Sequence, residues 1–174
     1  MRWRLIPKWL VEKASITRNE LFQYKKQFQN AIKVVLSKSN LGSLDEAAFP
    51  AYTHKNWIIN NLFWNRLYAA MNLLEVKNEA VGLDFGCGSG VMIPFLSSIS
   101  SQVIGADIDS IPISLIKEEL ELPDNIMFLL IENPLLPEIP ERSLDYITAL
   151  DVLEHVPDID QTIDVLRNKF KIDG

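Results

Sequence analysis

Apolar residues in the first third of the chain recur at helical spacing. The segment Thr17-Arg18-Asn19-Glu20 has the form of a capping box, in which the threonine hydroxyl and the glutamate carboxylate satisfy exposed amides of a first helical turn. The apolar positions that follow at intervals of three and four are Leu21, Tyr24, Phe28, Ile32 and Val35. The pattern predicts one long helix that ends near residues 40–42.

A second long helix is predicted after a loop that contains Pro50. Its apolar residues form a broad face and are Trp57, Ile58, Leu62, Phe63, Leu67, Met71 and Leu74. A face of this width must be buried, so we expect it to pack against another element. The aromatic residues of this segment, which include Trp64 and Tyr68, are expected mainly in the core, although some could line a pocket.

From residue 80 onward, short apolar runs alternate with helical segments, which is typical of a parallel sheet with crossover helices. The predicted strands are residues 80–84, 102–107, 126–131 and 145–150, and the predicted helices are residues 88–98, 111–120 and 159–170. We therefore predict an α/β, Rossmann-like, mainly parallel sheet at residues 75–174, preceded by a helical region or lid at residues 1–74. No strand is predicted after the last helix, so we expect a sheet truncated after its fourth strand, in a fragment or a naturally short chain.

Composition places the chain among globular proteins of about one domain. It has 174 residues, 48% of them hydrophobic and 23% charged, and the sequence contains no apolar run of membrane-spanning or signal-peptide length. Cys87 is the single cysteine, and His54 and His155 are the two histidines, so neither an intrachain disulfide nor a zinc-type ligand cluster is expected. These counts favour a cytoplasmic protein without a bound metal.

Charge is distributed unevenly along the chain. Residues 1–40 hold nine Lys and Arg against two acidic residues, and residues 41–174 hold eight against 21. The acidic main part argues against nucleic acid as a partner. The basic N-terminal part could contact an anionic surface such as a membrane, but we favour an interpretation in which it lies against the acidic part as a solvated helical lid.

Three glycines at alternate positions follow the first predicted strand. This strand ends near Asp84, and Gly86, Gly88 and Gly90 lead into a predicted helix. Glycine permits positive φ and lacks a Cβ, so the backbone can turn sharply and approach a ligand closely, while a helix N-terminus offers amides and a positive dipole end. Asp84 adds a negative charge that could hold a cationic amino group.

Two better-known nucleotide motifs do not match this segment. In the dinucleotide pattern G-x-G-x-x-G the third glycine would fall at Val91, and no Gly-Lys-Ser/Thr sequence is present for a P-loop. The next predicted strand ends in Asp107, 21 residues after Gly86. A carboxylate there can accept hydrogen bonds from both ribose hydroxyls of an adenosine, so it identifies a nucleoside without identifying the reaction.

Together these motifs resemble those of the class I methyltransferases, in particular the small-molecule methyltransferases that include enzymes of ubiquinone and menaquinone biosynthesis. The resemblance covers residues 80–174. Residues 81–90 resemble the first motif of that family, and residues 104–109 resemble the second. Residues 125–133 resemble its third strand, and residues 151–156 resemble the loop after its fourth strand.

The resemblance implies S-adenosyl-L-methionine as cofactor, with S-adenosyl-L-homocysteine as product, and it implies roles for individual residues. Gly86 and Gly88 would lie under the methionine portion, Asp84 near its amino group, and Asp107 on the ribose. The remaining candidates for cofactor binding are Cys87, Gly90, Ile108, Glu132, Asn133 and Asp151, of which Glu132 and Asn133 would face the adenine. His155 would lie near the transferred methyl group, as the candidate for a catalytic role. No nucleophilic role is expected for Cys87.

The predicted function is methyl transfer to an oxygen, nitrogen or carbon atom of a small molecule. A non-catalytic module that binds S-adenosylmethionine or a partner is the second hypothesis, and a nicotinamide-dependent oxidoreductase is the third. The oligomeric state and the methyl acceptor stay open at this stage.

Overall fold

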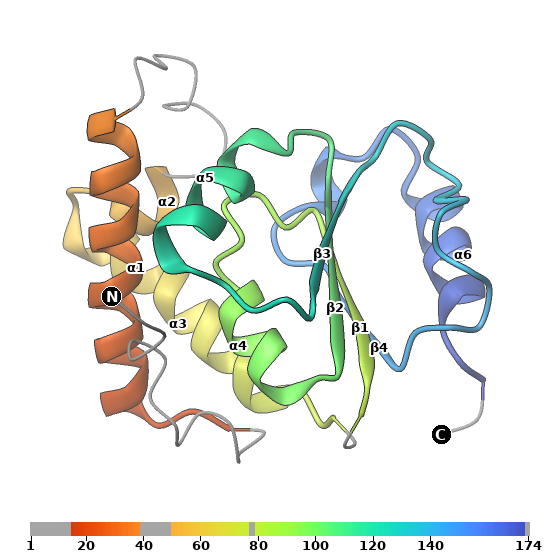
Figure 1. Ribbon diagram of the computed structural model, residues 1–174, viewed down its shortest axis with the longest axis horizontal. Coiled ribbons are helices and arrows are strands. Elements are labelled where there is room, and N and C mark those ends of the chain that lie inside the picture. The colour runs from red at the N-terminus through yellow and green to blue at the C-terminus, as the bar shows by residue number, and fades with distance from the viewer. Residues whose placement is uncertain (1–14, 39–49, 77–78, 173–174) are drawn as a thin grey trace.

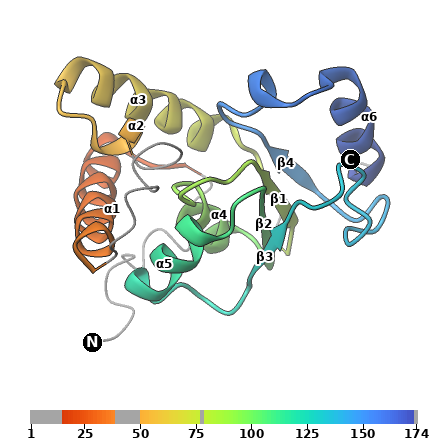
Figure 2. The same ribbon diagram turned by 90° about the horizontal axis from the view of Figure 1, so that it is seen from above.

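The computed structural model describes residues 15–38, 50–76 and 79–172, which form a sheet with helices on both faces (Figures 1 and 2). The strands are β1 (Val81–Phe85), β2 (Gln102–Asp107), β3 (Ile126–Leu130) and β4 (Tyr146–Thr148). The helices are α1 (Arg18–Lys38), α2 (Pro50–Thr53), α3 (Trp57–Leu73), α4 (Ile93–Ile99), α5 (Ile111–Leu120) and α6 (Ile159–Lys169), with a 3₁₀ turn at Leu153–His155.

The sheet is parallel and has the strand order β3-β2-β1-β4. The chain moves outward from β1 to β3 and then returns to the other side of β1, so the connections after β1 and β4 leave in opposite directions. In open parallel sheets such a reversal creates a crevice at the carboxyl ends of the strands. The predicted Rossmann-like α/β fold is confirmed by this topology.

Alternate strand residues face two separate hydrophobic clusters. One cluster joins the buried side chains of α1, α3, α4 and α5 to the sheet, and the other joins Leu83 and Ile104 of the sheet to Leu166 of α6. The period of two in the strands places these clusters on opposite faces. Because α1 and α3 share their cluster with α4 and α5, the helical region and the sheet are packed together.

The predicted strands 80–84 and 126–131 and the predicted helix 159–170 differ from β1, β3 and α6 by no more than one residue at either end, whereas two other predicted elements differ by more. The helix predicted for residues 88–98 begins only at Ile93, because Gly86, Gly88 and Gly90 have φ values of 70°, 51° and 73° that a right-handed helix cannot contain. The strand predicted for residues 145–150 is limited to Tyr146–Thr148. After α6, an isolated parallel bridge joins Phe170 to Leu144, so the chain touches the sheet again where only a helix end was expected.

The prediction for α3 was partly wrong. Trp64, Leu67 and Met71 are buried as expected, whereas Trp57 is 71% exposed and Leu62 is 56% exposed. Apolar residues of this helix occur on more than one face, and the face with Trp64, Leu67 and Met71 is the one that packs against α1 and the core. The end predicted for α1 and the basic segment before residue 15 lie outside the described residues.

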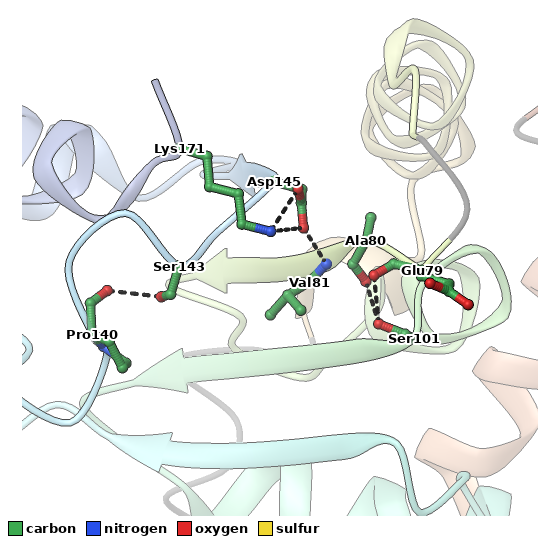
Figure 3. A network of polar contacts seen from close by, with 8 residues as sticks. All are labelled: Glu79, Ala80, Val81, Ser101, Pro140, Ser143, Asp145 and Lys171. Carbon is green, nitrogen blue, oxygen red and sulfur yellow. Dashed lines mark hydrogen bonds and ion pairs between the residues drawn. The ribbon is translucent and has the colours of Figure 1, made fainter. Parts of the chain in front are cut away.

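A cluster of polar contacts lies at the amino ends of the strands, where β1 and β4 begin (Figure 3). Asp145 accepts a hydrogen bond from the backbone N of Val81 at 2.8 Å, and the Nζ of Lys171 lies 2.8 Å from both of its carboxylate oxygens. Ser101 donates to the carbonyl oxygens of Glu79 and Ala80 on the other side of β1. The amino ends of β1 and β4, which lie away from the crevice, are therefore held by contacts from the segments after α4 and α6.

The capping box at Thr17 and Glu20 is formed as predicted.

A buried hydrogen bond joins α1 to the turn after β1, where the hydroxyl of Tyr24 donates to the carbonyl oxygen of Val91 at 2.5 Å. We expect Tyr24→Phe to lower the free energy of unfolding by about 1–3 kcal/mol, because the buried carbonyl loses its partner. Urea unfolding would measure this, with Tyr68→Phe as the half-buried control; equal stability of the two variants would contradict it.

None of the described helices is long and apolar enough to cross a membrane.

Candidate functional site

The glycine segment forms a tight turn directly after β1. The backbone amides of Gly86 and Cys87 both donate to the carbonyl oxygen of Ala106 on β2, at 2.7 and 3.1 Å. A Cβ on Gly86 would lie 2.2 Å from Val152, and one on Gly90 would lie 1.8 Å from the Cδ1 of Ile113. The turn therefore requires glycine both for its positive φ values and for its close approach to neighbouring segments.

Asp107, at the end of β2, holds this turn in place. Its Oδ2 accepts a hydrogen bond from the backbone N of Gly88 at 2.7 Å, and its Oδ1 accepts one from the backbone N of Asp109 at 3.1 Å. A carboxylate oxygen has two lone pairs, so each oxygen retains one acceptor position. Asp107 is half-buried and lines a pocket, so those positions are available to a ligand.

Asp84 is the most buried acidic group of the site. It is 4% exposed, and its Oδ1 accepts a hydrogen bond of 2.7 Å from the hydroxyl of Thr148 on β4. Burial raises the pKa of Asp84 from 3.8 to about 7; the Thr148 hydrogen bond acts in the opposite direction, and the nearby charge of Asp107 raises the pKa further. A cationic ligand group beside Asp84 would relieve this unfavourable burial of charge.

Two pockets meet over the glycine turn. The larger one, of about 620 Å³, extends from Asp107 to the 3₁₀ turn at His155. The smaller one, of about 130 Å³, lies between Asp84, the glycine turn and the helical region. Gly86, Gly88 and Asp151 line both pockets, so one elongated ligand can occupy the two together.

Two aromatic rings from the helical region close the smaller pocket. They are Tyr52 of α2 and Phe63 of α3, whose centroids lie 6.1 Å apart. The carbonyl oxygen of Tyr52 accepts hydrogen bonds from Gln29 at 2.7 Å, Asn60 at 2.8 Å and Trp64 at 3.2 Å. Because α1 and α3 supply these donors, the short helix α2 has a fixed position above the pocket.

A charged contact joins the helical region to the loop after β4. Arg66 of α3 donates to a carboxylate oxygen of Asp151, a non-glycine residue with a φ of 55°. The guanidinium of Arg66 also lies 5.6 Å from the centroid of the Phe63 ring. The carboxylate of Asp151, which was predicted to bind the cofactor, is therefore paired with Arg66 in the structure.

The structure brings most of the other predicted site residues to the crevice. Ile108, Glu132 and His155 line the larger pocket and are exposed, whereas Cys87 is buried beside the smaller one, where burial raises the pKa of its thiol. Gly90 lines neither pocket and packs against α5.

Asn133 also lines neither pocket, because its side-chain oxygen accepts a hydrogen bond from the backbone N of Leu135 at 2.9 Å.

Sequence reasoning missed several residues of the site, among them Tyr52, Arg66, Ser89 and Thr148. The Ser89 hydroxyl is buried, lacks a hydrogen-bond partner and belongs to a residue that lines the smaller pocket. An unpartnered buried hydroxyl is costly without a ligand or water. Ser89 could have been found because it lies within the recognised glycine segment, and Thr148 because the strand register places it opposite Asp84. No local pattern identifies Tyr52 or Arg66.

Comparison with known proteins adds independent observations. The profile of a family described as a methyltransferase domain matches residues 61–174. The ubiquinone biosynthesis O-methyltransferase of Pseudomonas fluorescens strain Pf-5 is 30% identical over 129 residues, which cover 69% of this chain and 55% of that protein. The enzyme of the same name from Stutzerimonas stutzeri is 29% identical over 133 residues. The chain thus spans about half the length of the curated relatives it matches.

Solved structures of the same architecture are also similar. The YcgJ protein of Bacillus subtilis superposes with a TM-score of 0.56 and 22% identity, over 63% of this chain and 47% of that chain. An S-adenosylmethionine-dependent methyltransferase of Mesorhizobium loti gives a TM-score of 0.51 and 20% identity, over 62% of this chain and 48% of that chain. At these identities the likeness concerns the fold alone.

Proposed function

This chain belongs to the methyltransferase domain family, and on that premise we propose that it binds S-adenosyl-L-methionine and transfers the methyl group to a small-molecule acceptor. The observation that carries the proposal is the pair of connected pockets over the glycine turn, with a buried carboxylate at one end and Asp107 in the other. The names of the curated relatives favour an acceptor oxygen over nitrogen or carbon.

The residues present fit this cofactor. The carboxylate of Asp84 would accept a hydrogen bond from the ammonium group of the methionine portion of the cofactor. The unpartnered hydroxyl of Ser89 would donate a hydrogen bond to the carboxylate of that same methionine portion. The free acceptor positions of Asp107 would bind the ribose hydroxyls, and the larger pocket would hold the adenine beside Ile108 and Glu132. Asn133 is not part of this proposal, because its side chain caps a turn instead.

The chain's own contribution to the reaction is alignment and exclusion of water. S-adenosylmethionine supplies a methyl group already activated by a positively charged sulfur. Tyr52 and Phe63 would cover the small pocket and restrict the acceptor to an approach in line with the bond that breaks. Burial raises the pKa of Tyr52 to about 12, so its hydroxyl remains a neutral donor and orients the acceptor rather than removing its proton.

In this proposal residues 1–74 form a helical lid over a cofactor-binding unit of residues 75–174. His155 is exposed on the rim of the larger pocket and is the candidate base for an acceptor proton. A cytoplasmic location is proposed as well, since the sequence holds one cysteine, which is a buried thiol.

Calorimetric titration with S-adenosylhomocysteine tests cofactor binding. We expect Asp107→Ala to weaken binding by at least tenfold, because two charge-assisted hydrogen bonds are lost and the turn at Gly88 loses its support. Asp124→Ala, an exposed carboxylate in the turn before β3, is the matched control and should bind like the wild type. Binding of NAD in place of S-adenosylhomocysteine would contradict the proposal, and binding without methyl transfer would favour the non-catalytic module.

A further inference from the structure

The outer face of α3 carries exposed apolar side chains from its first turn to its last. Trp64, Leu67 and Met71 face the core, and on the opposite side Ile58, Leu62, Ala69 and Leu73 recur at helical spacing, a set that we call the α3 outer stripe. Leu73 is 81% exposed, and Trp57 adds a largely exposed ring at the start of the helix. A row of exposed apolar side chains on a helix whose opposite face is already buried is normally covered, so this stripe indicates a partner.

Cationic side chains flank this stripe. Arg18 of α1 donates to the side chain of Asn65, and the Nζ of Lys25 donates to that of Asn61 at 3.0 Å, so both contact α3 itself. Lys55 precedes the helix and is exposed, and Arg66 is the one charged residue within it. The described acidic residues of the helical region are Glu20, which caps α1, and Glu75, which follows α3, and Asp151 of the loop after β4 contacts Arg66. The surroundings of the stripe are therefore mainly basic.

The helical region and the rest of the described residues carry charge of opposite sign. Residues 15–38 and 50–76 hold seven Lys and Arg against two acidic residues, whereas residues 79–172 hold five against 17. α1 and α3 lie on the side of the molecule away from α6 in both views (Figures 1 and 2). An anionic surface would attract the helical side and repel the rest, so the charge favours one orientation.

We propose that the α3 outer stripe is a docking surface for an anionic lipid bilayer. Exposed aliphatic side chains, a tryptophan and flanking cations are the combination by which helices bind the interface of a bilayer without crossing it. A protein partner would explain the apolar stripe, but it would not account for the basic surroundings and the acidic remainder. Phe63 and Arg66 lie on the adjoining side of α3, next to the small pocket, so the docked face would lie beside the site.

Sedimentation with vesicles tests the proposal on the full chain and without any turnover. We expect binding to phosphatidylcholine vesicles that contain phosphatidylglycerol, weaker binding at high salt, and little binding to phosphatidylcholine alone. The double variant Ile58→Ser/Leu62→Ser should reduce partitioning by roughly tenfold or more, because two apolar side chains that would be buried in the bilayer are replaced by short polar ones. The matched control is Ile159→Ser/Ile163→Ser on α6, where both residues are 46% exposed.

Circular dichroism would establish that both double variants are folded. The proposal is overturned if the wild type does not bind the anionic vesicles, or if both double variants bind them equally. It is also overturned if analytical ultracentrifugation shows a dimer that only the α3 variant loses, because the stripe would then be covered by a second copy of the chain. Loss of vesicle binding in the α3 variant alone supports it, whatever the outcome of the cofactor titration.

Discussion

Replacing Asp84 by asparagine is expected to stabilise the free protein above neutral pH and to weaken its binding of the cofactor at least tenfold. The two effects have one cause. Burial raises the pKa of Asp84 to about 7, so at pH 8 the folded protein keeps an ionised carboxylate away from water, with Thr148 as its partner. Asparagine has nearly the same shape and no charge, and the Thr148 hydroxyl can still donate to the carbonyl oxygen of Leu83.

The pH dependence follows from the direction of the shift. Since the folded-state pKa of Asp84 is raised, the stability that this group contributes is full below its unfolded pKa and is lost as the pH rises toward 7. Each pH unit in that range corresponds to about 1.4 kcal/mol. Relative to Asp84→Asn, the wild type should therefore lose about 2–3 kcal/mol between pH 5 and pH 8. Chemical denaturation at both pH values would measure the difference, with Asp124→Asn as an exposed control.

Cofactor binding should change in the opposite sense. The amino group of S-adenosylhomocysteine is cationic at pH 8, and its partner in the proposed site is ionised Asp84. We expect Asp84→Asn to weaken binding at least tenfold at pH 8, and the wild type to lose affinity roughly tenfold per pH unit below 7. A variant that binds with wild-type affinity, or a wild type whose affinity is independent of pH, would show that the amino group lies elsewhere.

A Gly90→Ala substitution is expected to lower the free energy of unfolding by about 3 kcal/mol. Left-handed backbone costs an alanine roughly 1–2 kcal/mol, and forcing a methyl group against the packed Cδ1 of Ile113 costs a further 1–3 kcal/mol. Thermal or urea unfolding would measure the loss. Since Gly90 lines neither pocket, any effect on cofactor affinity should be an indirect result of a displaced turn.

A second substitution separates the two costs. Ile113→Val removes the Cδ1 atom, after which the nearest side-chain atom of residue 113 would lie 3.1 Å from the new Cβ. Alone, Ile113→Val should cost about 0.5–1.5 kcal/mol. The double variant should be at least about 1 kcal/mol more stable than the sum of the two single variants predicts. Strict additivity would mean that the left-handed φ accounts for the whole effect.

The parallel sheet could be predicted from the sequence because its strands are short apolar runs with clear ends. The predicted bounds of β2 and α5 agree with the structure at both ends. The bounds of α4 could not be found in this way, because the apolar spacing of its helix continues back into a glycine turn whose positive φ values exclude a helix. Helix propensity indicates the conformation that residues 88–92 would prefer on their own. The hydrogen bond from the backbone N of Gly88 to Asp107 stabilises the turn that they adopt instead.

The site residues that the strands contribute to the crevice could be predicted from the sequence. Those that the helical region contributes could not. Asp84 and Asp107 stand at strand ends, and the ends of adjacent parallel strands must meet. Tyr52 reaches the site because α2 lies across the small pocket, and Arg66 because α3 passes the loop after β4. The positions of α2 and α3 relative to the sheet depend on how the helices pack on it, and no periodic pattern in the sequence indicates that packing. The exposure of the α3 outer stripe was missed because apolar spacing indicates which residues need cover and not what provides it.

The three donors on the carbonyl oxygen of Tyr52 make this position a natural place for altering specificity. Gln29, Asn60 and Trp64 all bind the main chain at residue 52, so the path of the backbone there does not depend on which side chain it bears. Exchanging the tyrosine would reshape the wall of the small pocket while the anchoring stays intact. Libraries of variants at residue 52 should therefore yield folded proteins with different preferences among acceptors, which is the property that directed evolution of a catalyst requires.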